Sequence, residues 1–257
     1  MEKGKNKILS NIKNSLIGVI SNIFAVFSKS LNKVISQVHF LDPKDNTKQR
    51  IVTALILFPI AIYAIFFSQN LFNLMSVAIA ILMAWEWSNI TKTAPDKDKK
   101  KWQTIGFFYI LIPVYSIVQI RSIDVDILFW MFAIIWTTDI FAFFSGKTFG
   151  GPKLAPSISP NKTWSGLAGG VISSVVIGIV CSSLFSGSVI FFMIASMSLS
   201  ILEQISDLIE SKIKRIFGVK DSGNSIPGHG GVLDRMDGIV LVAPVILLLI
   251  VITPGSF

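Results

Sequence analysis

The sequence has 257 residues, of which 52% are hydrophobic and 15% charged, and it carries a formal net charge of +8. So few charges and so much apolar surface exclude a soluble globular domain of ordinary composition and indicate a polytopic membrane protein. The positive charge does not indicate a nucleic-acid partner, because the basic residues alternate with apolar segments rather than with base-stacking aromatics.

The first part of the chain predicts a helix on the membrane surface. Apolar side chains recur at helical spacing from Ile8 to Val38, with lysines among them. The apolar centre, Leu16 to Phe27, is short for a span, and no small-residue cleavage site of a signal peptide follows it. We therefore expect residues 1–49 to form a basic amphipathic arm with an interfacial helix, an extra span or a disordered arm being the alternatives.

Residues 50–257 are predicted to form one transmembrane domain, an all-α bundle of about seven membrane helices. Its single cysteine, Cys181, excludes an intrachain disulfide and a thiolate metal cluster. The apolar runs near spanning length are Ile51 to Phe67, Leu71 to Ile90, Thr104 to Ile120, Ile127 to Ser145, Trp164 to Phe185, Val189 to Asp207 and Gly238 to Ile252.

The distribution of cations predicts the orientation of these spans. With the N-terminus in the cytoplasm, 22 of the 23 Lys and Arg residues fall on the cytoplasmic side and only Arg121 falls outside. The cytoplasmic cations lie in the arm up to Arg50 and in the loops Thr91 to Gln103, Gly146 to Thr163 and Glu210 to Asp237. We therefore expect an integral protein of a bacterial-type inner (plasma) membrane, with its charged loops and its active site on the cytoplasmic side.

Carboxylates interrupt two of the predicted spans. Asp139 lies within the fourth span, where a lone carboxylate is costly, so it should face the bundle interior and find a partner from another segment. Glu203, Asp207 and Glu210 lie on one face of the sixth span, at i, i+4 and i+7. The structural alternatives are a hydrogen-bond anchor at Asp139 and an i+4 pair between Glu210 and Lys214.

The loop between the fourth and fifth spans has the residues of an anion site. It contains Lys147, Lys153 and Lys162 among glycines and prolines, which predict turns. Ser159, Asn161 and Thr163 can cap the fifth helix and leave Lys162 beside its exposed amides. The loop has no GxxxxGK[ST] string, which excludes a P-loop, and a purely structural helix cap is the alternative.

The segment Ser211 to Asp237 has the highest density of chemically active residues in the chain. It combines cations suited to phosphates, carboxylates suited to a hard metal ion, and glycines such as Gly230 and Gly231 that let backbone approach a ligand. Gly218 is a predicted helix stop, and His229 could orient a phosphate or transfer a proton. With so few histidines, Mg²⁺ on carboxylate oxygens is preferred over a His-based metal site. A solvated run of charges is the alternative.

This segment resembles the signature of the phosphatidate cytidylyltransferase (CDP-diacylglycerol synthase) family. The matching residues are Ser211, Lys214, Arg215, Lys220, Asp221, Pro227, His229, Gly230, Gly231, Asp234, Arg235 and Asp237. The run DIFAFFSGKTFGGPKLAPSISPNKTW is similar to the family's second motif. The chain departs from the family at Ser206, where similar proteins usually have Gly, and at Ser165, where they usually have Glu.

The resemblance implies that phosphatidic acid attacks the α-phosphorus of CTP to give CDP-diacylglycerol and pyrophosphate. It implies Mg²⁺, alone or with a second cation, on Asp207 and Asp234, with Asp221 and Asp237 completing or supporting the shell. Lys214, Arg215, Lys220 and Arg235 would hold the triphosphate and the lipid phosphate, with Lys162 and Ser159 at the lip of the site. The lipid would enter from the inner leaflet and CTP from the cytoplasm, and family analogy favours a homodimer.

Three other functions are compatible with parts of this pattern. A secondary transporter of an anionic substrate also uses intramembrane carboxylates, although a long charged loop speaks against it. Another CTP-dependent lipid enzyme would share the signature. An inactive paralogue is the third alternative, because Ser165 and Ser206 differ from the residues that similar proteins usually have.

Overall fold

The computed structural model describes residues 46–185, 187–226 and 230–253, so most of the predicted arm of residues 1–49 lies outside the described residues. The chain divides into two compact units. Of the described residues, 46–58 and 224–226 belong to the smaller unit, while 59–223 and 230–253 belong to the larger one. The candidate site described below lies within the larger unit.

The chain is mostly helical, as predicted. The helices within the described residues are α2 (Asn46–Phe67), α3 (Gln69–Ile90), the 3-10 turn η1 (Thr91–Thr93), α4 (Asp96–Ile123), α5 (Val125–Phe149), α6 (Trp164–Leu184), α7 (Val189–Ile216) and α8 (Leu233–Ile252). Six of them, from α3 to α8, are long and apolar enough to cross a membrane. The first predicted span forms a helix, but its apolar part, Thr53–Phe67, is shorter than the other six.

Several helices continue beyond the apolar runs that predicted them. α4 begins at Asp96 and α7 reaches Ile216, because backbone hydrogen bonding continues where the side chains become charged. Acidic residues in the first turn of α4 and Lys214 and Arg215 in the last turn of α7 match the helix dipole. The predicted stop at Gly218 is confirmed, since this glycine has φ +69° just after the helix.

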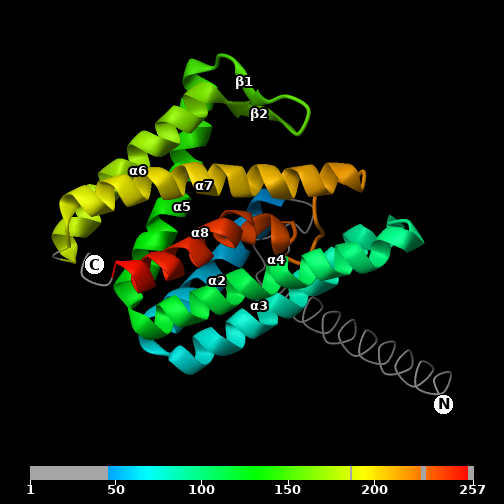
Figure 1. Cartoon of the computed structure of the whole chain (residues 1–257), viewed down its shortest axis with the longest axis horizontal. Coiled ribbons are helices and arrows are strands. Elements are labelled where there is room, and N and C mark those ends of the chain that lie inside the picture. Colours follow the sequence, from blue (N-terminus) through cyan, green and yellow to red (C-terminus); the bar gives the residue numbers. More distant parts are fainter. Residues whose placement is uncertain (1–45, 186, 227–229, 254–257) are drawn as a thin grey trace. The chain divides into compact units, whose positions relative to one another are not determined.

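The loop between α5 and α6 contains an antiparallel hairpin that the sequence analysis did not predict. Its strands are β1 (Lys153–Ala155) and β2 (Ser159–Thr163), with Lys153 opposite Thr163. β2 runs directly into α6, and Figure 1 shows the hairpin beyond the end of that helix. Thr163 caps α6 by accepting a hydrogen bond of 3.1 Å from the Gly166 amide. The predicted caps Ser159 and Asn161 are wrong, because both residues belong to β2.

Small residues bring α5, α6 and α7 close together. A Cβ atom on Gly166 would lie 2.7 Å from the Ala142 carbonyl oxygen of α5, and one on Gly178 would lie 2.6 Å from the Phe192 carbonyl oxygen of α7. Such contacts let helix backbones approach closely in a membrane. α7 also packs on α8, and α8 packs on α4. The polar ends of α5, α7 and α8 therefore converge.

Candidate active site

A polar cavity of about 460 Å³ opens between α5, the hairpin, α6 and α7. Its lining includes most of the residues that the sequence analysis assigned to substrate binding. They are Asp139, Lys147, Asn161, Lys162 and Thr163, together with Lys153, Gln204 and Asp207. Three lysines and two aspartates from segments far apart in the sequence therefore share one cavity.

Lys162 is the best-anchored cation of the cavity. Its Nζ lies 2.5 Å from Asp207 Oδ2 and donates a hydrogen bond of 2.8 Å to Gln204 Oε1. The Gln204 amide in turn donates to Glu203 Oε2 at 2.9 Å. The Lys162 and Asp207 side chains remain 18% and 22% exposed, so the pair is accessible from the cavity. Gln204 was missed by the sequence analysis, because an uncharged amide in an apolar helix carries no signal of its own.

Asp139 has the partner from another segment that its place in a span predicts. It lines the same cavity as Lys162 of β2, and its carboxyl group interacts electrostatically with that lysine and with Asp207 of α7. Asp139 therefore faces the cavity between the helices, where it remains exposed and is not packed in the bundle interior.

The predicted polar face of α7 connects the cavity to a second group of polar residues. Ser211 donates a hydrogen bond of 3.2 Å to Asp207 Oδ1. One turn further on, Lys214 Nζ lies 3.0 Å from Glu210 Oε1 and 2.6 Å from Asp234 Oδ1 of α8. The predicted pair of Glu210 and Lys214 therefore exists, and the same ammonium group also ties α7 to α8. The three side chains are only 10%, 4% and 12% exposed for Lys214, Glu210 and Asp234.

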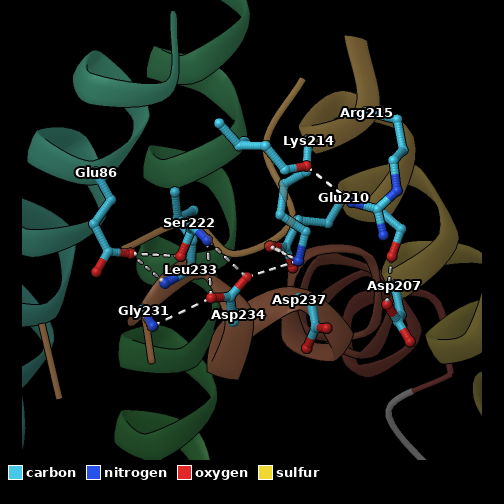
Figure 2. A network of polar contacts seen from close by, with 12 residues as sticks. Glu86, Asp207, Glu210, Lys214, Arg215, Ser222, Gly231, Leu233, Asp234 and Asp237 are labelled. Carbon is cyan, nitrogen blue, oxygen red and sulfur yellow. Dashed lines mark hydrogen bonds and ion pairs between the residues drawn. The ribbon is translucent and has the colours of Figure 1, made fainter. Parts of the chain in front are cut away.

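Asp234 is held from several directions. Besides Lys214, the backbone amide of Ser222 donates to its two oxygens at 3.2 and 3.0 Å, and the amide of Gly231 donates to Oδ2 at 3.2 Å. Gly230 adopts φ +89°, a conformation that favours glycine, just before this contact. Figure 2 shows Lys214, Ser222 and Gly231 around the carboxylate. The predicted role of the glycines in close backbone approach is thus seen for Gly231, with the protein's own carboxylate as its partner.

Glu86 of α3 joins the same group of contacts and was missed by the sequence analysis. Its side chain is completely buried and accepts hydrogen bonds from Ser222 Oγ at 3.0 Å, the Val232 amide at 2.9 Å and the Leu233 amide at 2.8 Å. A lone carboxylate in an apolar span is the signal that singled out Asp139, and the run LMAWEWSNI presents it equally. We call Glu86, Glu210, Lys214, Ser222, Gly231, Val232, Leu233 and Asp234 the Asp234 network.

Asp237 and Ser206 connect α7 and α8 next to this network. Ser206 Oγ donates to the backbone carbonyl of Asp237, and the Asp237 carboxylate accepts from the Gly238 amide at 2.8 Å. That carboxylate also interacts electrostatically with Asp207. The Ser206 departure from the family therefore supplies an interhelical hydrogen bond that a glycine could not make.

The remaining predicted residues are not part of the Asp234 network, or lie outside the described part of the chain. Arg215 is exposed and donates to the Val219 carbonyl at 2.9 Å. Lys220 and Asp221 are exposed, and the exposed Arg235 interacts electrostatically with Asp139. Ser159 lies in β2 and is not part of the cavity lining, while His229 and Pro227 lie outside the described residues.

Ser165, the second departure from the family, donates to the Gly150 carbonyl and lines a separate apolar groove between α5 and α6. The residue that replaces the family's usual Glu therefore takes part in local loop structure. It does not line the polar cavity.

Carboxylate oxygens are the ligand type that a hard cation such as Mg²⁺ takes. Within the described ranges, no three His, Cys, Asp or Glu side chains form a group that could hold a metal ion. Mg²⁺, however, is usually bound by one or two carboxylates together with substrate phosphates. Both Glu210 oxygens are buried without a hydrogen bond, even though Lys214 lies nearby. Acidic side chains here outnumber Lys162 and Lys214, the lysines that pair with them among the described residues.

Comparison with known proteins agrees with this arrangement of residues. The family model described as "Cytidylyltransferase family" matches residues 48–121 and 102–253. The chain belongs to the cytidylyltransferase family. A phosphatidate cytidylyltransferase of Rickettsia bellii is 39% identical over 214 residues, covering 79% of this chain and 90% of that protein. One of Rickettsia felis is 38% identical over 219 residues, covering 81% and 94%, and one of Brucella abortus is 34% identical over 250 residues, covering 79% and 93%.

The matched residues of this cytidylyltransferase family member include the whole cavity and the whole Asp234 network. The family resemblance stated from the Ser211 to Asp237 signature is therefore confirmed, and it extends to α2, α3 and α4, where the sequence analysis recognised only hydropathy.

Proposed function

We propose that this chain is a phosphatidate cytidylyltransferase of a bacterial inner membrane. In the reaction, a phosphate oxygen of phosphatidic acid forms a bond to the α-phosphorus of CTP, and the bond from that phosphorus to the oxygen bridging the β-phosphorus breaks. The products are CDP-diacylglycerol and pyrophosphate. The observation that carries the proposal is the cavity that gathers Lys147, Lys153, Lys162, Asp139 and Asp207 among apolar helices of a cytidylyltransferase family member.

The cations of the cavity have the task of bringing two anions together. Lys147 and Lys153 are exposed at the cavity, where their ammonium groups can bind phosphate oxygens of either substrate. Lys162 is held in place by Asp207 and Gln204, so its position is fixed before substrate arrives. Such a fixed cation can bind a substrate phosphate without first being reorganised. A phosphate nucleophile is already ionised at neutral pH, so no strong base is required.

The acidic residues of α7 and α8 would hold Mg²⁺. Asp207, Asp234 and Asp237 are the proposed ligands, with Asp221 in support, and bound Mg²⁺ neutralises charge on the phosphates that must meet. Asp207 and Asp234 have lysine partners in Lys162 and Lys214. These lysines balance the carboxylates when no cation is bound, and Lys162, which faces the cavity, is available to phosphate oxygens when one is.

We also propose the topology predicted by the cation distribution, with seven spans, a cytoplasmic N-terminus, a surface helix in residues 1–49 and the site at the cytoplasmic face. The exposed lysines Lys97 to Lys101 and the cavity would then share one side, with Arg121 on the other. Single cysteines introduced at Lys101 and Arg121 in a Cys181→Ala background test this with a membrane-impermeant thiol reagent. Labelling of the Lys101 position in intact cells would contradict it. A homodimer stays a prediction from family analogy.

The transfer reaction is tested with purified protein, phosphatidic acid, Mg²⁺ and CTP labelled at the α-phosphate. We expect label to enter the lipid phase and pyrophosphate to accumulate in equal amount. A secondary transporter or an inactive paralogue would leave the label water-soluble. Replacing phosphatidic acid by other lipid phosphates in the same assay separates this enzyme from another CTP-dependent lipid enzyme.

A further inference from the structure

Glu86 is a buried carboxylate outside the cavity that accepts hydrogen bonds from the segments around Asp234. It lies near the end of α3 and is 0% exposed. A buried carboxylate is costly unless hydrogen-bond donors satisfy it. Glu86 meets this requirement with donors from two separate segments, the Ser222 hydroxyl and the amides of Val232 and Leu233.

The two amides begin α8, the helix that carries Asp234. The first amides of a helix have no partner within it, and the helix has no side-chain cap of its own at Val232. Glu86 supplies that cap from α3, and its negative charge suits the positive end of the helix dipole. The cap fixes the position of the first turn of α8, where Asp234 stands.

Ser222 connects Glu86 directly to Asp234. Its hydroxyl donates to Glu86 Oε2, while its backbone amide donates to both oxygens of Asp234. Figure 2 shows Ser222 between the two carboxylates. The same residue therefore transmits the position of α3 to the carboxylate of α8.

Two glycines leave no free space in this junction. A Cβ atom on Gly231 would lie 1.8 Å from Ser222 Oγ and 2.9 Å from Glu86 Oε2, and one on Gly223 would lie 3.2 Å from Glu86 Oε1. Backbone thus packs directly against the Glu86 carboxylate from both segments. A shift of that carboxylate must displace the amides of Ser222 and Gly231, which are the donors to Asp234.

We propose that Glu86 is a positioning residue for the reaction, which places the Asp234 carboxylate and its Lys214 partner by holding Ser222 and the start of α8. The inference rests on the proposed function, since it assigns to Asp234 a part in cytidylyl transfer. Glu86 itself is not among the residues that line the cavity.

Glu86→Gln in the full-length protein tests the inference, because the amide keeps the size of the side chain. Its NH2 group, however, is a hydrogen-bond donor and would face the N–H and O–H donors that now bind the carboxylate. Ser196→Ala is the matched control, since it removes another buried interhelical hydrogen bond, the one from Trp130 Nε1 at 3.0 Å, far from these contacts in the sequence. We expect kcat of Glu86→Gln to fall about tenfold or more with KM for CTP within about threefold, as expected for a misplaced reacting geometry. Ser196→Ala should keep the wild-type kcat.

A second readout does not depend on turnover. Hydrogen–deuterium exchange of peptides covering Ser222 and residues 230–236 should accelerate in Glu86→Gln and stay at the wild-type rate in Ser196→Ala. Ser222→Ala, which removes one hydroxyl and keeps the amide on Asp234, should lower kcat by about threefold, and the double variant should lie within about twofold of Glu86→Gln because the two residues share one contact.

The inference is overturned if kcat or exchange in Glu86→Gln matches Ser196→Ala, or if the two single effects of Glu86→Gln and Ser222→Ala multiply in the double variant. Should Glu86→Gln not fold, unchanged kcat and exchange in Ser222→Ala overturn it equally. Failure of the proposed function is a separate result: the wild-type protein would not transfer label to lipid, whereas the exchange comparison would still report on the placement of Asp234.

Discussion

The cavity and the Asp234 network are neighbours on α7, but they are built in opposite ways. The cavity has exposed lysines and a central pair, Lys162 and Asp207, that is about one-fifth exposed. The Asp234 network is buried, and its carboxylates Asp234 and Glu86 accept hydrogen bonds from backbone amides that cannot move independently of the chain. The first arrangement suits groups that exchange partners with a substrate. The second suits groups that must stay in place.

Substitutions in the two regions should therefore have different effects on substrate affinity, turnover and stability. Substitutions in the cavity should change substrate affinity and leave the protein as stable as before. Substitutions in the Asp234 network should change turnover or stability, because a buried polar group that loses its hydrogen-bond partner cannot replace that partner with water.

Asp234→Asn is expected to have the largest effect. The amide loses the charge that pairs with Lys214 and that would bind Mg²⁺, so label transfer from CTP to lipid should fall roughly 100-fold or more. The assay is the initial rate with the purified variant, and monodisperse elution in detergent confirms folding. Retained turnover in a folded variant would refute the proposed metal ligand.

Lys162→Ala is expected to act mainly on substrate binding. The ammonium group pairs with Asp207 and faces the cavity, and a charge-assisted hydrogen bond of about 1.5–3 kcal/mol corresponds to a roughly 10- to 100-fold rise in KM for CTP. Lys101→Ala, an exposed lysine of α4, is the control and should leave KM unchanged. If Lys162→Ala instead lowered kcat and left KM unchanged, Lys162 would act in the way expected of the Asp234 network. The contrast drawn between the two regions would then be wrong.

Ser206→Gly is expected to have the smallest effect on activity and a measurable effect on stability. The change removes the hydrogen bond to the Asp237 carbonyl and adds the helix cost of glycine, together about 2 kcal/mol. Ser198→Gly on the exposed side of α7 carries the same helix cost, about 1 kcal/mol, and removes only an exposed hydrogen bond to the Ile194 carbonyl of the same helix. Thermal unfolding of both variants measures the difference, and equal midpoints would show that the interhelical bond contributes no net stability.

Local patterns in the sequence predicted the elements of the site better than the contacts between them. The i, i+4, i+7 spacing of Glu203, Asp207 and Glu210 predicted one face of α7, and Gly218 predicted its end, because both depend on the backbone of a single helix. The i+4 pair of Glu210 and Lys214 was foreseen for the same reason. The contact of Lys214 with Asp234, twenty residues later, depends on the packing of α7 against α8 and has no local signal.

Two misses have different physical reasons. The hairpin of β1 and β2 was not predicted because glycines and prolines dominate the loop, and its strands are short and gain their order from pairing. Glu86 was missed although a lone carboxylate in a span is a usable signal. What the sequence could not show is that its partners include the backbone amides of Val232 and Leu233 at the start of α8, 146 and 147 residues later.

α7 is one uninterrupted helix of 28 residues, about 42 Å long, and it carries Asp207 and Lys214 two turns apart. A rod of this length responds to bilayer thickness by tilting as a whole, so both residues would move together against α5 and α8. The lipid composition of the membrane would thereby change the activity of the enzyme that makes the phospholipid precursor for that same membrane.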